Sequence, residues 1–327
     1  AEDVRSPYCR RGLLSGRAVE RFRIRRDGES FGWILVDPAL IKSGLGRIDY
    51  QKPKLLLRQT GDELIAANNL YGGTFTQFDA ILPQQGITTH FTAVNDFEAV
   101  EKAINERTRA LYIETVGNPA LDAADIERYA AVAEKHHLPL IVDSTFTPPT
   151  LLRPIEHGAD IVVHSLSKWI GGHGTGIGGI VVDAGKFDWS DPKFALYNEP
   201  DRGYHGMRFA HDLGDEIPLA FSFRLRFVGL RNQGAALAPD AAWIFLQGVE
   251  SLPLRMAKHS ENALRVAEFL KKHPKVEWVR YPGLPDDPSW PIASKYMKNG
   301  FGGMVVFGVR GGSAEAMKLV DNIRLFS

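Results

Sequence analysis

The sequence predicts an α/β fold in which a mostly parallel sheet is flanked by helices and followed by a smaller C-terminal α/β domain. Three observations support this prediction. From Gly61 onward, short apolar runs typical of buried strands alternate with segments whose apolar residues recur at helical spacing. Hydrophobic residues make up 44% of the 327 residues, which is enough for a sizeable core. Polar residues also follow directly after several apolar runs, where parallel strands place ligand-binding side chains.

The local patterns place the individual elements in order. Helices are expected at Asp96–Arg107 and Asp122–His137, with Asp122 as a candidate cap. Later helices are expected over residues 238–250, 253–272 and 314–322. Short strands are expected over residues 110–114, 138–142, 161–163, 180–183, 276–281 and 303–309. A proline-rich turn is expected between the last two strands, over residues 281–291.

These patterns divide the chain into three regions. Residues 1–58 form an atypical N-terminal segment that contains ten arginines and has poor hydrophobic periodicity. Residues 59–252 are expected to form a large cofactor-binding domain. Residues 253–327 are expected to form part of a small domain that is unfinished at Ser327.

The overall composition excludes several classes of protein. Lys+Arg and Asp+Glu both number 39, so the charge balance gives no sign of a nucleic-acid partner. The single cysteine, Cys9, excludes an intrachain disulfide and fits a reducing compartment. No apolar run reaches the length of a membrane span, and no signal peptide is visible. We therefore expect a cytoplasmic protein without a membrane partner.

Lys168 is the first candidate for chemistry. It follows a buried apolar run and precedes several glycines, which is an unusual place for a surface charge. A Schiff-base lysine needs this placement, partly desolvated at the carboxyl end of a sheet, so that its amine can react at neutral pH. Ser165 and Ser167 lie beside it and could donate hydrogen bonds to a phosphate. An ordinary solvated loop lysine is the simpler alternative for Lys168 taken alone.

Three further residues strengthen the prediction of a cofactor site. Asp143 ends the strand LeuProLeuIleValAsp, so its carboxylate would point into the crevice where ligands bind. Such an acid keeps a pyridine nitrogen protonated, which lets the ring accept carbanion charge. Tyr71 precedes two glycines and could lie flat over a ring. Asn118 precedes a proline and could bond a ring hydroxyl, or it could simply form a turn.

Three other motifs point to different functions and are discounted. Gly174, Gly176 and Gly179 match the dinucleotide fingerprint, but a strand-like run follows them where a helix is required. Residues 165–168 match the serine–lysine motif of penicillin-recognising enzymes, but the lysine triplet at 42–44 precedes the motif and should follow it. His157, His164 and His173 have spacings that fit no helix-face pair, so we expect no metal site.

Residues 61–327 resemble the cysteine/methionine-metabolism family of pyridoxal-phosphate enzymes, and are most similar to its O-acetylhomoserine sulfhydrylases. The resemblance covers about four fifths of the chain. The matching segments occur in order at the family's spacing and are residues 69–78, 112–122, 139–146, 153–174 and 246–256. The resemblance implies a type I pyridoxal-phosphate transferase fold.

The resemblance also assigns roles to the matching residues. It implies that Lys168 carries pyridoxal 5'-phosphate and shuttles protons, and that Asp143 pairs with the pyridine nitrogen. It places Tyr71 over the ring, where it would help to activate the incoming amino acid. Ser165 and Ser167 would hold the phosphate, although the family usually has threonine at the second position. Asn118 would lie near the ring hydroxyl.

The implied reaction is gamma-replacement on O-acetylhomoserine by sulfide or methanethiol, which gives homocysteine or methionine. Residues 199–209 resemble a long insertion of the sulfhydrylases and favour this subclass over cystathionine synthases and methionine gamma-lyases. The resemblance also implies a homodimer or homotetramer, because the family builds its site across a dimer.

Two departures from the family keep a second hypothesis open. Residues 1–58 show neither the tyrosine and arginine of the family's amino arm nor its Ser-Gly phosphate turn. The family also continues beyond the equivalent of Ser327 and supplies there an arginine for the substrate carboxylate. The alternative to a sulfhydrylase is therefore a truncated, non-catalytic homologue that acts as a binding or assembly partner.

Overall fold

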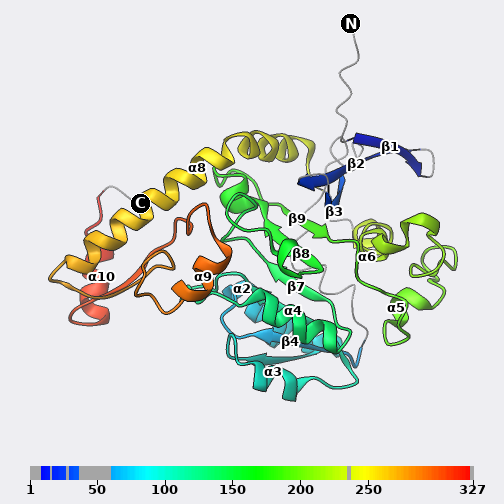
Figure 1. Cartoon of the computed structure of the whole chain (residues 1–327), viewed down its shortest axis with the longest axis horizontal. Helices are drawn as coiled ribbons and strands as arrows, with labels where there is room; N and C mark the ends of the chain where they lie inside the picture. Colours follow the sequence, from blue (N-terminus) through cyan, green and yellow to red (C-terminus); the bar gives the residue numbers. More distant parts are fainter. Residues whose placement is uncertain (1–8, 15–16, 27–28, 37–59, 234–236, 325–327) are drawn as a thin grey trace, which may run out of the picture.

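The structure is a computed structural model that describes residues 9–14, 17–26, 29–36, 60–233 and 237–324. Its centre is a nine-stranded sheet with the strand order β1-β2-β3-β9-β8-β7-β6-β4-β5 (Figure 1). The strands are β1 (Cys9–Leu14), β2 (Arg17–Arg26), β3 (Glu29–Val36), β4 (Glu63–Ala67), β5 (Thr88–Thr92), β6 (Thr108–Glu114), β7 (Leu140–Asp143), β8 (Ile161–Ser165) and β9 (Gly179–Asp183).

Strands β4 to β8 are mutually parallel, whereas β9 and the three N-terminal strands pair antiparallel. β7 is buried at every position, which is typical of a parallel strand with both faces covered. The predicted fold class is confirmed. The four strands predicted between residues 110 and 183 are present with shifts of one or two residues at their ends. β4 and β5 were not predicted individually.

Nine α-helices are described, and they lie on both faces of the sheet and beyond its edges (Figure 1). They are α2 (Gly72–Thr76), α3 (Phe97–Ala103), α4 (Ile126–Lys135), α5 (Ala195–Asn198), α6 (Ala220–Arg224), α7 (Arg231–Gln233), α8 (Pro239–Lys272), α9 (Trp290–Tyr296) and α10 (Ser313–Asp321). The elements that follow α8 are called the C-terminal elements. They are α9, α10 and a two-stranded antiparallel sheet of β10 (Val276–Arg280) and β11 (Val306–Val309). No helix among the residues described is both long and apolar enough to cross a membrane.

Two of the helix predictions are wrong in instructive ways. The helices predicted over 238–250 and 253–272 are one 34-residue helix, α8, because Pro253 is tolerated inside it. Pro253 and Val249 are both exposed, so water can bond the carbonyl that the proline leaves without a partner. Asp122 does not cap α4, whose first turn follows Asp125. The proposed boundary between residues 252 and 253 falls within α8 and stays a prediction.

The C-terminal elements pack against the large sheet domain along α8 and α9. In Figure 1 they lie beside α8, in orange and red. Within α9, Ala293 is buried in the main core, which is built around strands β4 and β6 to β8. α9 itself was missed because its first turn contains Pro291 and follows a proline-rich stretch, although proline is well suited to a first helical turn.

Candidate active site

A pocket of about 460 Å³ lies at the carboxyl ends of the parallel strands. Its size is within the ordinary range for small-molecule sites. All six residues that the sequence singled out line it, namely Tyr71, Asn118, Asp143, Ser165, Ser167 and Lys168. They come together because parallel strands end at the same edge of the sheet, so residues distant in the sequence converge there.

Asp143 forms the buried polar floor of the pocket. It is the last residue of β7 and only 5% exposed. Its Oδ2 accepts a hydrogen bond from the Tyr112 hydroxyl at 3.2 Å, and its Oδ1 accepts one from the Thr145 N–H at 2.9 Å. These two donors fix the carboxylate in one orientation, so that it presents a localised negative charge to the pocket.

Lys168 lies in a tight turn, Leu166–Ile170, directly after β8 ends at Ser165. Its backbone departs from helical geometry, with φ −98° and ψ −128°. The Ser167 hydroxyl accepts a hydrogen bond from the Gly178 N–H at 3.0 Å, which ties the turn to the return strand. The Lys168 residue is exposed, whereas partial desolvation was expected.

Helix α8 holds the Lys168 turn from the other side. The Arg255 guanidinium donates to the carbonyls of Trp169 at 2.7 Å and Ile170 at 3.2 Å, and also to the carbonyl of Gly248 at 2.7 Å. Burial lowers the pKa of Arg255 from its usual range. Arg255 therefore holds backbone carbonyls next to the lysine through charged hydrogen bonds, a role that was not predicted from the sequence.

Gly248 allows this close approach between α8 and the turn. A Cβ at this position would lie 2.4 Å from the Gly171 carbonyl oxygen and 2.7 Å from that of Ile170. We expect Gly248→Ala to force the helix and the turn apart, with an overpacking cost of about 1–3 kcal/mol. The melting temperature and the affinity for any cofactor bound in the pocket should both fall. The exposed Glu250→Ala variant on the same helix should change neither, and an unchanged Gly248→Ala protein would contradict the prediction.

Tyr71 and Asn118 lie on the opposite wall. Tyr71 precedes α2, and its backbone N–H donates to the Glu114 carboxylate at 2.7 Å. Asn118 lies on the loop after β6, and its backbone N–H donates to the Asn69 carbonyl at 3.1 Å. Because Asn69 is two residues before Tyr71, this hydrogen bond joins the segment that carries Tyr71 to the loop that carries Asn118.

Sequence reasoning missed several residues that line the pocket. Glu114 is 6% exposed and ends β6 as Asp143 ends β7, so the same signal could have identified it. Thr145 follows β7 by two residues. His259 and Met304 come from α8 and from the C-terminal elements, and only the folded chain brings them to the pocket.

His164 precedes Ser165 in β8 and lies close enough to Asp143 for their charges to interact. It is 3% exposed, and its Nδ1 donates to the Ser144 carbonyl at 2.9 Å. Burial lowers the pKa of His164 to about 4, and the negative charge of Asp143 only partly opposes this. The imidazole is therefore neutral at physiological pH, and its proton is on Nδ1 because a carbonyl can only accept.

This histidine predicts a dependence of stability on pH. The pKa of His164 is about 4 when folded and near 6.5 when unfolded, so the unfolded state binds the extra proton between those values. Stability should therefore be lost as the pH falls from about 6.5 to 4, by about 2–3 kcal/mol. Denaturant unfolding at pH 7 and 4.5 measures this loss in the wild type and in His164→Asn.

The comparison with His164→Asn is necessary because other groups titrate in the same range. Burial raises the pKa values of Asp160 and Asp183 to about 6, which makes stability fall as the pH rises from about 4 to 6. These carboxyls are common to both proteins. The difference between the two proteins in how the free energy of unfolding changes with pH therefore reports on His164 alone. Equal losses in the two proteins would refute the assignment.

The structure describes the residues of two of the three discounted motifs, the glycine run and the histidines. The strand β9 follows the glycine run, as expected, so no helix is present to bind a dinucleotide. His157 contacts Glu127, whereas His164 and His173 contact the carbonyls of Ser144 and Gly171. Within the described ranges, no group of three or more His, Cys, Asp or Glu residues is placed to hold a metal ion. The triplet at 42–44 lies outside the described residues.

Comparison with known proteins extends these observations to the family level. A family model for Cys/Met metabolism PLP-dependent enzymes, where PLP is pyridoxal phosphate, matches residues 38–327. The match begins at residue 38, so it extends further toward the N-terminus than the resemblance to residues 61–327 seen in the sequence.

Individual relatives agree with this assignment. An O-acetyl-L-homoserine sulfhydrylase from Leptospira meyeri is 49% identical over 275 residues, which cover 82% of this chain and 62% of the relative. A homocysteine synthase from Schizosaccharomyces pombe is 46% identical over 83% of this chain and 63% of its own length. The chain thus spans less than two thirds of the length of these relatives.

A solved structure gives the same result. It is described as an O-acetylhomoserine (thiol)-lyase from Campylobacter jejuni carrying N'-pyridoxyl-lysine-5'-monophosphate. Its TM-score is 0.80 at 36% sequence identity, and the match covers 84% of this chain and 68% of that one. The pocket, the order of the strands and these matches lead to one conclusion: the chain belongs to the family of Cys/Met metabolism PLP-dependent enzymes.

Proposed function

We propose that the protein catalyses gamma-replacement on O-acetylhomoserine with sulfide or methanethiol, giving homocysteine or methionine. The observation that carries the proposal is the convergence of Lys168 and Asp143, from neighbouring parallel strands, on one pocket. The names of the two relatives described above, a sulfhydrylase and a homocysteine synthase, support the choice of reaction.

The residues of the pocket fit pyridoxal 5'-phosphate. Asp143 is a buried carboxylate held in a fixed orientation, as a partner for a pyridinium nitrogen requires. Lys168 supplies an amine to the same pocket, and Ser165 and Ser167 add hydroxyls beside it for the phosphate. On the opposite wall, we assign Tyr71 to the face of the ring and Asn118 to its hydroxyl.

Bound pyridoxal phosphate supplies an electron sink for the carbanions that form at the substrate. With the cofactor bound, the Lys168 amine would take the proton from the substrate's alpha carbon, pass it on, and then take one from the beta carbon; both protons would return to the substrate carbons as the product forms. The bond between the gamma carbon and the acetate oxygen breaks, and a bond to the incoming sulfur forms. Tyr71 would help to activate the incoming amino acid from its place over the ring.

The remaining assignments belong to the same proposal. We propose a homodimer or homotetramer in the cytoplasm, without nucleic-acid or membrane partners. The single cysteine and the balanced charge support this environment.

The direct test supplies purified protein, pyridoxal phosphate, O-acetylhomoserine and sulfide, and measures acetate and homocysteine. Both products should form at equal rates. Release of ammonia and a 2-oxo acid without added thiol would instead indicate a gamma-lyase, and formation of cystathionine from cysteine would indicate a cystathionine synthase. A visible cofactor band without acetate release would favour the non-catalytic homologue. Absence of any cofactor band would refute the proposal.

A further inference from the structure

The loop that carries Asn118 into the pocket has a well-defined shape. Val116 and Ala123 form an isolated antiparallel bridge at its base. The Gly117 N–H donates to the Asp122 carbonyl at 3.0 Å, and the Leu121 N–H donates to the Gly117 carbonyl at 3.0 Å. Asn118 lies within this small ring of backbone bonds, so a shift of the loop would shift Asn118.

The loop also contains a strained residue. Leu121 has φ 61°, in the left-handed region that costs a non-glycine residue about 1–2 kcal/mol. Such a conformation persists only where surrounding contacts determine it. Leu121 is 1% exposed, so these contacts come from the protein interior.

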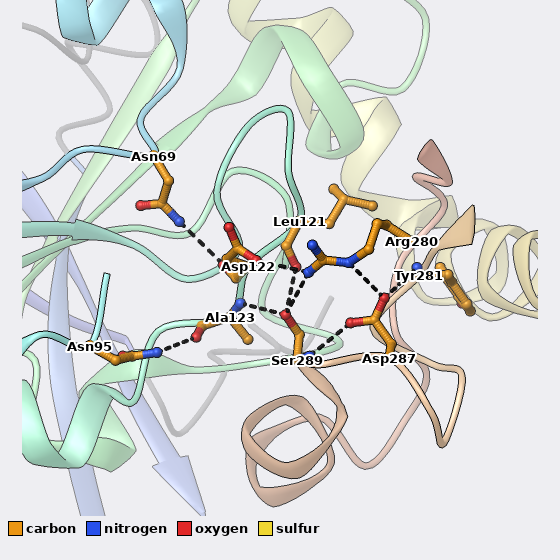
Figure 2. Close-up of polar contacts among 9 residues, drawn as sticks. All are labelled: Asn69, Asn95, Leu121, Asp122, Ala123, Arg280, Tyr281, Asp287 and Ser289. Atoms are coloured by element: carbon orange, nitrogen blue, oxygen red, sulfur yellow. Dashed lines mark hydrogen bonds and ion pairs between the residues drawn. The ribbon is translucent and has the colours of Figure 1, made fainter. Parts of the chain in front are cut away.

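The C-terminal elements supply those contacts through Ser289, the residue before α9 (Figure 2). The Ser289 hydroxyl donates to the Leu121 carbonyl at 3.0 Å and accepts from the Ala123 N–H at 3.1 Å. One side chain therefore bonds both sides of the turn, and it is only 4% exposed. Because Ser289 lies 168 residues after Leu121 in the sequence, only docking of the C-terminal elements can provide this contact.

Two charged residues hold Ser289 in this position. Asp287, whose side chain is fully buried, accepts from the backbone N–H groups of Ser289 at 2.8 Å and Tyr281 at 2.9 Å. Arg280 bridges Asp287 at 3.1 Å and Asp122 at 2.8 Å (Figure 2). Asp122, which the sequence suggested as a helix cap, instead ties the loop to the C-terminal elements.

The loop held by Ser289 also contacts the segment before Tyr71, so the position of the loop affects both Asn118 and Tyr71. The Asn69 side-chain amide donates a hydrogen bond to the backbone carbonyl of Asp122 at 3.4 Å. The backbone carbonyl of Asn69 accepts a hydrogen bond from the Asn118 N–H. A Cβ on Gly117 would lie 2.5 Å from the Asn69 carbonyl oxygen, which shows how closely the two segments pack. Asn69 is two residues before Tyr71, so Ser289 is connected through contacts to both Asn118 and Tyr71.

We propose that Ser289, supported by Asp287 and Arg280, is a positioning residue that sets the Asn118 loop and makes the cofactor site depend on docking of the C-terminal elements. This inference rests on the proposed function only where it concerns the cofactor. The contact between Ser289 and the loop stands on its own geometry, so the two parts can be tested separately.

The test compares the Ser289→Ala variant of the whole 327-residue chain with the wild type, each loaded with pyridoxal phosphate. Hydrogen exchange at the Leu121–Ala124 amides should quicken roughly 10-fold or more, as expected when a buried hydrogen-bonding partner is removed. The dissociation constant for pyridoxal phosphate should rise several-fold. The visible circular dichroism of the bound cofactor should also change, because the opposite wall of the pocket has moved.

Ser222→Ala is the matched control. The Ser222 hydroxyl donates to the buried Asp183 at 2.9 Å, and Asp183 pairs with the first residue of β8, at the sheet edge opposite the pocket. Ser222→Ala should lower the melting temperature but leave loop exchange and the dichroism unchanged. If Ser289→Ala behaves in the same way, the inference is wrong. If the wild type binds no pyridoxal phosphate, the proposed function fails, and loop exchange alone decides the contact.

Discussion

Lys168→Ala is expected to lose covalent attachment of pyridoxal phosphate and to slow gamma-replacement by roughly 10²–10⁴-fold or more, because the amine is assigned both the attachment and the proton transfers. Borohydride treatment followed by peptide mass spectrometry should place the reduced cofactor on Lys168 in the wild type and on no peptide of the variant. The visible absorption band of the lysine-bound cofactor should also be lost.

Lys258→Ala provides the control for a simple loss of charge. Lys258 lies exposed on α8, pairs with Glu261 three residues on, and is not among the residues that line the pocket. Its removal should leave both trapping and turnover unchanged. A Lys168→Ala protein that retained full activity would overturn the mechanism and leave the pocket without an assigned proton carrier.

Asp143→Asn is expected to have the second-largest effect. The substitution keeps the shape of the side chain but removes the charge that would hold the pyridine nitrogen protonated. A hydrogen bond to a charged group contributes about 1.5–3 kcal/mol, which corresponds to roughly 10- to 150-fold in affinity or rate. Titration of the apoprotein with pyridoxal phosphate and steady-state turnover would measure the two effects.

Asp183→Asn is a suitable control, because Asp183 is also a buried carboxyl at a strand end. It accepts from Gly185 and Ser222 at the opposite edge of the sheet, so its replacement can change stability without touching the pocket. Affinity for the cofactor should stay at the wild-type value in this variant. Equal losses of affinity in the two variants would show that Asp143 acts only through the stability of the fold.

The residues of the candidate site are held in two ways, by the ends of the parallel strands and by contacts from distant segments to the loops. Strands β6, β7 and β8 end in Glu114, Asp143 and Ser165, and place these polar groups at one edge of the sheet. Contacts from distant segments then fix the loops that complete the pocket. Arg255 holds the Lys168 turn, and Ser289 holds the loop of Asn118.

The elements that the sequence predicted well are those determined by local pattern. The apolar runs that became β6 to β9 are short and bounded by polar residues, and they could be located within one or two residues. Helix ends were less well predicted, because Asp122 and Asp125 are both acceptable caps by type. In the folded chain both side chains are engaged by the C-terminal elements instead, Asp122 by Arg280 and Asp125 by Tyr296.

The sequence by itself determined the fold class and the strands that carry Asp143 and Ser165, because these follow from local periodicity, and its resemblance to the family singled out the six residues that line the pocket. The tertiary structure alone decided how Lys168 and Asn118 are held. Arg255 and Ser289 lie 86 and 168 residues from the carbonyls they bond, and such contacts leave no periodic trace in the sequence. Their partners are backbone carbonyls and amides, which every residue type offers alike, so only the folded geometry identifies them.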